Sequence, residues 1–323
     1  MEIREAAVSK VALVFPGQGA QYVGMGKDLY DLSPAAREVF TQADEALGFS
    51  ITRLCFEGPS DALEDTLNTQ PAILTTSIAC LAAMRERLES IGARLTPRFV
   101  AGHSLGEYSA LVAAGSLNFT DAVRLVRERG RLMKESGQER PGGMAAILGL
   151  DEAKVAEACA KAREKGIVAP ANYNCPGQMV ISGEIGALVE ATNLAVQMGA
   201  RKAIRLAISI ASHSPLMQRA SEQLAEAVGR FRLADAQVPV VANISAQVIT
   251  TCEDIRRELN EQICRAVQWA QSVQRMLEDG TSVFIEVGPG QSLSGLIKRV
   301  GRGAEVMSVS DAASLEKLVR RLG

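Results

Sequence analysis

One pentapeptide constrains the fold of this chain more than any other stretch. The apolar segment Phe99–Ala101 leads directly into Gly102-His-Ser-Leu-Gly106, and a helical pattern begins at Glu107. In a strand–turn–helix context, a G-x-S-x-G sequence lifts its serine above the end of a sheet. The two glycines lack a Cβ, so the strand and the helix can pack closely around the turn. We therefore predict that Ser104 is a nucleophile, with an ordinary Gly-Ser turn as the alternative.

Short apolar runs alternate with helical patterns through most of the 323 residues. This alternation predicts a mostly parallel sheet with helices on both faces. The expected fold class is therefore α/β, with a large α/β-hydrolase-like domain. Gln70-Pro71 is predicted to open a long buried helix from Ala72 to Ser90. The runs that indicate buried strands are Val11–Phe15, Phe99–Ala101, Val238–Asn243, Ser282–Val287 and Glu305–Val309.

A separate unit interrupts this alternation after a break at Gln138–Gly143. The segment from Met144 to Ile208 has the pattern strand, helix, strand, strand, helix, strand, which is the order of a ferredoxin-like unit. We predict a small inserted ferredoxin-like (βαββαβ) subdomain over residues 138–208. The large catalytic domain would consist of residues 1–137 and 209–323.

The composition excludes several classes of function. Hydrophobic residues make up 47% and charged residues 22% of the chain, and the net charge is -2, so neither nucleic acid nor a membrane is an expected partner. No apolar run approaches the roughly 20 residues of a membrane span. The charged start, Met1–Glu5, does not resemble a secretory signal. The scattered cysteines form no C-x-x-C pair, so we expect reduced thiols, a cytoplasmic location and no metal.

A serine needs a base to become a nucleophile at neutral pH, and the chain has only two histidines. His103 adjoins Ser104, and neighbouring side chains at a strand end point to opposite faces, so we expect His103 to be structural. His213 is then the candidate base, with a structural histidine as the alternative. Ordinary α/β-hydrolases place the histidine near the end of the chain. The early position of His213 therefore argues against a generic esterase.

Seven motifs occur in the order of a known family and cover nearly the whole chain. They are Val14-Phe-Pro-Gly-Gln-Gly-Ala-Gln21, Gly102-His-Ser-Leu-Gly-Glu-Tyr108, Arg127-Glu-Arg-Gly-Arg-Leu-Met133, Ala171-Asn-Tyr-Asn-Cys-Pro-Gly-Gln178, Ala211-Ser-His-Ser-Pro-Leu-Met217, Gln262 through Trp269, and Glu286-Val-Gly-Pro-Gly290. In these motifs the chain resembles the acyltransferase family of fatty-acid and polyketide synthesis, which includes the malonyl-CoA:acyl carrier protein transacylases. The resemblance implies ping-pong transfer of a malonyl group from malonyl-CoA to acyl carrier protein in fatty-acid biosynthesis. It also implies a monomer that needs no cofactor.

The resemblance assigns roles to particular residues. Ser104 would hold the acyl group as an ester, and His213 would act as general base and then as general acid. A main-chain carbonyl near Gln262 would orient the histidine in place of an aspartate. The backbone N–H groups of Gln18 and Leu105 would form the oxyanion hole.

The same resemblance also predicts which residues select the substrate. Arg129 would bind the free carboxylate of the malonyl group through two parallel hydrogen bonds. Asn172, Asn174 and Ser212 are candidates to line the pocket. The Ala-Ser sequence before His213 also occurs with methylmalonyl preference, so a methylmalonyl substrate stays an alternative to malonyl.

Three further alternatives remain open from the sequence. The enzyme could be a free-standing partner of a polyketide synthase instead of a fatty-acid enzyme. A thioesterase could use the same Ser104 and His213 for hydrolysis, although Arg129 and the position of the histidine argue against it. A non-catalytic binding domain is the third alternative, and the intact Ser, His and Arg set disfavours it.

Overall fold

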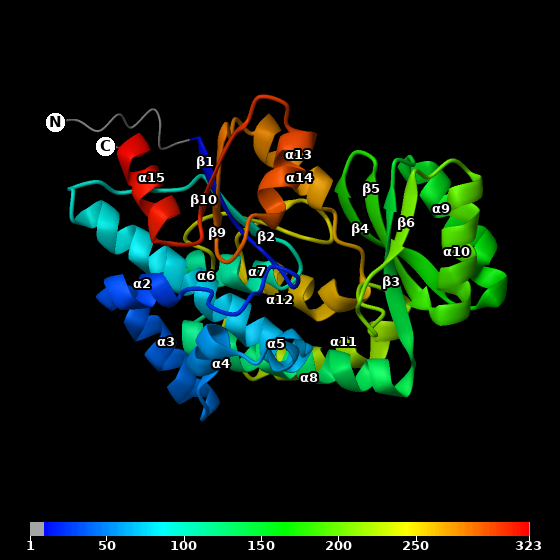
Figure 1. The fold of residues 1–323 in the computed structure, drawn as a ribbon, viewed down its shortest axis with the longest axis horizontal. Helices are drawn as coiled ribbons and strands as arrows, with labels where there is room; N and C mark the ends of the chain where they lie inside the picture. Colours follow the sequence, from blue (N-terminus) through cyan, green and yellow to red (C-terminus); the bar gives the residue numbers. More distant parts are fainter. Residues whose placement is uncertain (1–9, 323) are drawn as a thin grey trace.

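A six-stranded sheet forms the centre of the larger part of the molecule (Figure 1). The computed structural model describes residues 10–322, so the expectation for Met1–Glu5 lies outside the described residues. The strand order is β10-β9-β1-β2-β7-β8, and every neighbouring pair is parallel except β7 and β8. The mostly parallel sheet is confirmed. Its strands are β1 (Val11–Phe15), β2 (Phe99–Gly102), β7 (Val240–Val241), β8 (Val248–Ile249), β9 (Val283–Val287) and β10 (Glu305–Val309).

Helices cover both faces of this sheet, as the apolar alternation predicts. One face packs on α13 and α14, and α6, α7 and α15 lie against the other, with further helices packed outside them. None of the described helices is long and apolar enough to cross a membrane. The helices are α2 (Lys27–Leu32), α3 (Pro34–Leu47), α4 (Ile51–Glu57), α5 (Ser60–Glu64), α6 (Thr66–Glu89), α7 (Gly106–Ala113), α8 (Phe119–Glu139), α11 (Gln218–Gly229), α12 (Cys252–Glu261), α13 (Trp269–Glu278), α14 (Ser292–Val300) and α15 (Ala312–Leu322).

The buried helix α6 begins at Thr66, six residues before the predicted start at Ala72. Asp65 caps it by accepting a hydrogen bond from the N–H of Leu67 at 3.1 Å, and Pro71 lies inside the helix. The proline was expected to mark the start, but the cap and the burial of α6 along most of its length outweigh the one lost backbone hydrogen bond.

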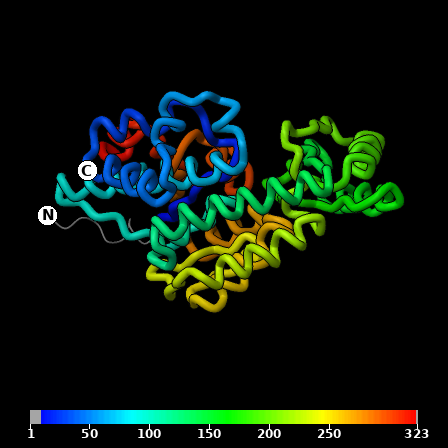
Figure 2. Tube along the Cα trace, turned by 90° about the horizontal axis from the view of Figure 1, so that it is seen from below, coloured from blue at the N-terminus to red at the C-terminus, as the bar shows by residue number. Residues whose placement is uncertain are grey.

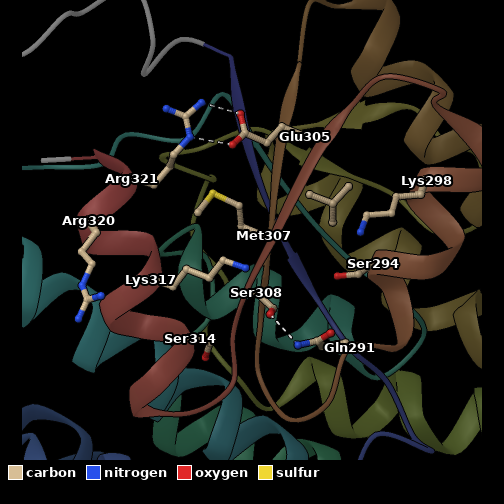
Figure 3. A pocket seen from close by; sticks show the side chains of 11 residues that line it. Gln291, Ser294, Lys298, Glu305, Met307, Ser308, Ser314, Lys317, Arg320 and Arg321 are labelled. Carbon is tan, nitrogen blue, oxygen red and sulfur yellow. Dashed lines mark hydrogen bonds and ion pairs between the residues drawn. The ribbon is translucent and has the colours of Figure 1, made fainter.

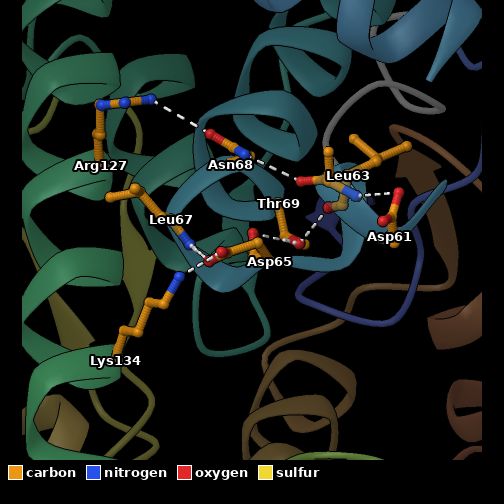
Figure 4. Close-up of polar contacts among 9 residues, drawn as sticks. Asp61, Leu63, Asp65, Leu67, Asn68, Thr69, Arg127 and Lys134 are labelled. Carbon is orange, nitrogen blue, oxygen red and sulfur yellow. Dashed lines mark hydrogen bonds and ion pairs between the residues drawn. The ribbon is translucent and has the colours of Figure 1, made fainter. Parts of the chain in front are cut away.

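Helix α8 packs closely on the start of α6. A Cβ at Gly130 would lie only 2.6 Å from the carbonyl oxygen of Thr66. Polar contacts flank this close approach (Figure 4): Arg127 donates to Asn68 Oδ1 at 3.4 Å, and Lys134 forms an ion pair with Asp65. The packing and the polar contacts together fix α8 against α6 at the level of residue 129.

The smaller part is an antiparallel sheet with two helices on one side (Figure 1). Its strand order, β4-β5-β3-β6, is that of a ferredoxin-like unit, which confirms this part of the predicted fold class. Figure 2 shows α8 running from the larger part toward the smaller one. The boundaries at residues 138 and 208 stay a prediction. The elements are β3 (Gly142–Leu148), α9 (Glu152–Ala162), β4 (Val168–Cys175), β5 (Gln178–Glu184), α10 (Ile185–Gln197) and β6 (Lys202–Arg205).

Charged side chains surround the open edge of the large sheet at β10 (Figure 3). A cleft of about 630 Å³ there is lined by Lys298, Lys317 and Arg320, and Arg321 pairs with Glu305 at 3.1 Å. Charges beside an edge strand prevent pairing with other chains. Strands β9 and β1 separate β10 from β2, which ends just before Ser104. The charged side chains around the cleft protect this edge strand.

The elbow leaves no room for a side chain at Gly106, because a Cβ there would lie 2.1 Å from the carbonyl oxygen of Phe15. We expect Gly106→Ala to lower the free energy of unfolding by about 3 kcal/mol. Gly295→Ala is the matched control: apart from its own stretch of α14, no atom of the described residues lies within 4 Å of its Cβ position, so stability should rise by up to about 1 kcal/mol. Urea unfolding checks both, and equal stability of the two variants would contradict the prediction.

Candidate active site

The turn after β2 holds Ser104 in a strained conformation. Ser104 has φ 52°, a left-handed value that serine rarely adopts. Its N–H donates to Asn243 Oδ1 at 2.7 Å, and Asn243 Nδ2 donates to the carbonyl oxygen of Gly102 at 2.7 Å. A Cβ at Gly102 would lie 1.9 Å from the carbonyl carbon of Gly106. The glycines and Asn243 therefore set the direction in which the serine points.

His213 lies against the serine hydroxyl, with 2.8 Å between its Nε2 and Ser104 Oγ. Its Nδ1 lies 2.9 Å from the carbonyl oxygen of Gln262 and 3.1 Å from that of Arg265. Carbonyl oxygens only accept, so Nδ1 carries the proton and Nε2 is free to accept from the serine. The segment Gln262–Cys264, a single 3-10 turn, thus presents the carbonyl that orients the histidine.

The surroundings keep His213 neutral. The ring is buried, and this desolvation together with the positive charge of Arg129 lowers the pKa of His213 to about 3. Hydrogen bonds to the two carbonyls oppose this shift but do not outweigh it. At neutral pH the imidazole is therefore ready to take a proton from Ser104.

Arg129 extends from α8 into the same site and is only 1% exposed. Its Nη1 donates to Gln70 Oε1 at 2.7 Å, and its Nη2 donates to both Ser104 Oγ and Gln262 Oε1 at 3.0 Å. Among the described residues, its Nε has no hydrogen-bond partner, and no carboxylate forms an ion pair with the guanidinium. A buried cation without a counter-ion is costly. The site is therefore suited to a ligand that brings an anionic group close to Ser104.

The N-terminal glycine loop lies directly against the elbow. A Cβ at Gly17 would lie 2.4 Å from the carbonyl oxygen of His103, so only glycine allows this approach. Within residues 10–322, the backbone N–H groups of Gln18 and Leu105 donate to no other group. Both residues line a cavity of about 120 Å³ together with Ser104. Two unpaired N–H donors beside a nucleophile are what an oxyanion hole needs.

The remaining candidates fall in two places. Asn172 and Ser212 line the cavity, as does His103. Asn174 is not among the residues that line it, and its Oδ1 lies 2.9 Å from Nε2 of His103. In this structure Asn174 contacts His103, which lines the cavity, and the predicted role of Asn174 in the pocket stays a prediction. His103 also packs near Trp269, with 5.7 Å between ring centroids, in keeping with a structural role.

Sequence reasoning missed three residues of this network. Gln70 was assigned only to the start of a helix, yet it accepts from Arg129. Asn243, two residues after β7, and Glu107 of α7 hold the elbow in place by hydrogen bonds. Asn243 carried a usable signal, because a polar residue directly after a buried parallel strand faces the sheet edge where sites form.

Attack by Ser104 on a carbonyl carbon, with His213 taking the proton, is the chemistry of enzymes that carry an acyl group on serine. A parallel α/β sheet that ends in this elbow is also typical of enzymes of that class. The family model described as the acyl transferase domain matches residues 12–321, and the chain belongs to that family.

Several relatives are similar over almost their full length. The malonyl CoA-acyl carrier protein transacylase of Bacillus subtilis is 46% identical over 316 residues, which cover 98% of each chain. That of Haemophilus influenzae is 42% identical over 95% of this chain and 97% of its own. Among solved structures, the malonyl-CoA:acyl carrier protein transacylase of Xanthomonas oryzae has a TM-score of 0.92 and 41% identity, covering 97% and 98%. A malonyl-transacylase in complex with a type II PKS acyl-carrier protein has a TM-score of 0.92 and 38% identity, covering 97% and 99%.

The pKa of His213 predicts an unusual pH profile for acylation of Ser104. Protonation of Nε2 removes the base, so the rate should fall only as the pH drops far below 6.5, the ordinary histidine value, toward about 3. Stopped-flow measurement of acylation by p-nitrophenyl acetate at low pH checks this fall in rate, after the background rate of the Ser104→Ala variant is subtracted. A half-maximal rate near pH 6.5 would contradict the assignment.

Proposed function

We propose that this protein transfers a malonyl group from malonyl-CoA to the phosphopantetheine thiol of acyl carrier protein in fatty-acid biosynthesis. The observation that carries the proposal is the buried guanidinium of Arg129, which has no counter-ion among residues 10–322 and whose Nη2 lies 3.0 Å from Ser104 Oγ. Malonyl has a free carboxylate at the distance of one methylene from its thioester, and acetyl has none. The names of the relatives support the same substrate pair.

Each half-reaction uses the same groups. Ser104 Oγ attacks the malonyl thioester carbonyl while His213 Nε2 takes the hydroxyl proton. The N–H groups of Gln18 and Leu105 stabilise the oxyanion, and its collapse breaks the carbon–sulfur bond. The imidazolium returns the proton to the departing coenzyme A thiolate, which leaves a malonyl ester on the serine. The carrier-protein thiol then attacks this ester by the reverse sequence.

The proposal includes the setting of the reaction. No cofactor takes part, because acyl exchange between a thiol and a hydroxyl needs only a nucleophile, a base and hydrogen-bond donors. A monomer suffices, since one chain supplies Ser104, His213, Arg129 and both N–H groups. The composition and the reduced cysteines favour the cytoplasm.

A second candidate is the same transfer in polyketide synthesis, which the similar complex with a type II PKS acyl-carrier protein favours. The active-site chemistry is identical in the two pathways. Rates with fatty-acid and polyketide carrier proteins at equal concentration distinguish them. Hydrolysis by a thioesterase is disfavoured, because the cavity is small and Arg129 would hold the malonyl ester in it.

The acyl-serine intermediate is directly observable. After incubation with malonyl-CoA and no carrier protein, intact mass spectrometry should show one malonyl adduct, and Ser104→Ala should show none. Release of coenzyme A should be a single-turnover burst. Continued release over many turnovers would indicate a thioesterase, and an adduct on Ser104→Ala would place the nucleophile elsewhere.

Arg129 should determine the preference for malonyl over acetyl. Arg129→Ala removes two charge-assisted hydrogen bonds, so kcat/KM for malonyl-CoA should fall by about 100-fold or more, with a much smaller change for acetyl-CoA. Arg131→Ala is the matched control on the same helix, since Arg131 is half-exposed and pairs with Glu128 and Glu135. An unchanged ratio of the two substrates in Arg129→Ala would refute this role.

A further inference from the structure

The side-chain amide of Gln262 connects three parts of the site. Its Oε1 accepts from Arg129 Nη2 at 3.0 Å, and its Nε2 donates to the carbonyl oxygen of Ser104 at 2.8 Å. The same Nε2 donates to Glu107 Oε2 at 2.6 Å. Gln262 and Glu107 are both 0% exposed, so water does not compete for these bonds. A buried carboxyl is thus linked through one amide to both the guanidinium and the elbow.

The groups at the two ends select one of the two possible orientations of this amide. In the observed orientation, the carbonyl meets the guanidinium of Arg129 and the NH₂ meets the carboxyl of Glu107. If the amide rotated by half a turn, its NH₂ group would face the N–H donors of Arg129, and its carbonyl oxygen would face the carboxyl oxygen of Glu107. Neither pair could then form a hydrogen bond. Buried polar groups left unpaired in this way are costly. Glu107 therefore determines which face of Gln262 is presented to Arg129.

The other oxygen of Glu107 is held as well. Its Oε1 accepts from the backbone N–H of Asn243 at 2.9 Å, and the Asn243 side chain holds the N–H of Ser104. Burial and the nearby Glu258 carboxyl raise the pKa of Glu107, while the N–H donors of Asn243 and Gln262 lower it. Both carboxyl oxygens act as acceptors, so the side chain cannot turn without breaking a hydrogen bond.

We propose that Glu107 is a positioning residue for the substrate carboxylate: through Gln262 it holds Arg129 in place without neutralising it. The inference rests on the proposed malonyl transfer. A carboxylate in direct contact with Arg129 would compete with the malonyl carboxylate for the same guanidinium. Because the amide of Gln262 lies between them, Glu107 fixes the position of the Arg129 guanidinium and leaves it free to bind an anion.

Glu107→Gln tests this role, because glutamine has the same shape but accepts with only one of its two terminal atoms. The new side-chain NH₂ group must face a donor, which is either the N–H of Asn243 or the NH₂ group of Gln262 that lies between position 107 and Arg129. We expect kcat/KM for malonyl-CoA to fall about tenfold or more, with KM affected most, and the preference over acetyl-CoA to fall with it. Labelling of Ser104 by phenylmethylsulfonyl fluoride, which needs no arginine, should change by less than about threefold.

Glu286→Gln is the matched control. Glu286 is another fully buried carboxyl, and it accepts from the N–H groups of Leu293 at 2.9 Å and Ser294 at 2.8 Å, away from Gln262 and Arg129. This variant should keep transfer and labelling within about twofold of wild type. The proposal is overturned if Glu107→Gln keeps the wild-type preference for malonyl, or if it lowers labelling and transfer by the same factor. A wild-type protein that forms no malonyl adduct would instead refute the proposed function.

A second variant covers the case in which Glu107→Gln does not fold. The exchange Glu107→Gln with Gln262→Glu restores a donor-to-acceptor contact between positions 107 and 262, and thermal unfolding should show a folded protein. It also sets a carboxylate directly against Arg129, so the malonyl-to-acetyl ratio should drop about tenfold or more. A folded double variant with the wild-type ratio would overturn the proposal.

Discussion

The active site depends on the burial of the Arg129 guanidinium, which has no counter-ion in the part of the chain that the structure describes. Taking a charge out of water costs several kcal/mol, on the order of what a whole domain has as net stability. Arg129 offsets this with oxygen acceptors from Gln70, Gln262 and Ser104, which come from α6, η3 (Gln262–Cys264) and the elbow. Its position therefore requires that these three elements meet, and the close approach of α8 to α6 at Gly130 makes this possible.

The same charge shapes the chemistry of its neighbours. It lowers the pKa of His213, which keeps the base neutral, and it donates to the oxygen that attacks the substrate. Ser104 and His213 both have positive φ, at 52° and 58°, a strain of about 1–3 kcal/mol each. Hydrogen bonds oppose the strain: Asn243 holds the N–H of Ser104, and the carbonyl of Ile263 accepts the N–H of His213 at 2.8 Å. Two strained residues thus face each other because their surroundings leave no other conformation.

Local patterns predicted the parts of the fold and site that depend on neighbouring residues. The apolar run before Gly102 and the glycines around Ser104 are sufficient for the elbow, and the alternation after Gly143 is sufficient for the ferredoxin-like order. Local patterns did not predict contacts between distant segments beyond those that the resemblance to the family implied for Ser104, His213, Gln262 and Arg129. Glu107 and Asn243 are 136 residues apart and become partners only when β7 lies beside β2. The start of α6 was misplaced for a related reason, because Pro71 is a strong local signal whose cost is outweighed by burial against α8.

The inserted unit completes the site instead of merely adding to the surface. Strand β4 bonds to the larger part through Tyr173 N–H and Val267 O at 2.9 Å, and through Val267 N–H and Ala171 O at 2.8 Å. Val267 lies two residues beyond Arg265, whose carbonyl faces His213, so the smaller part is anchored to the segment that orients the base. The chain that leaves this unit then passes over the site, where Leu206, Ile208 and Ile210 form an apolar wall of the cavity. Apolar side chains in the lining of the cavity limit the access of water to an ester that must wait for a second thiol, and this favours transfer over hydrolysis.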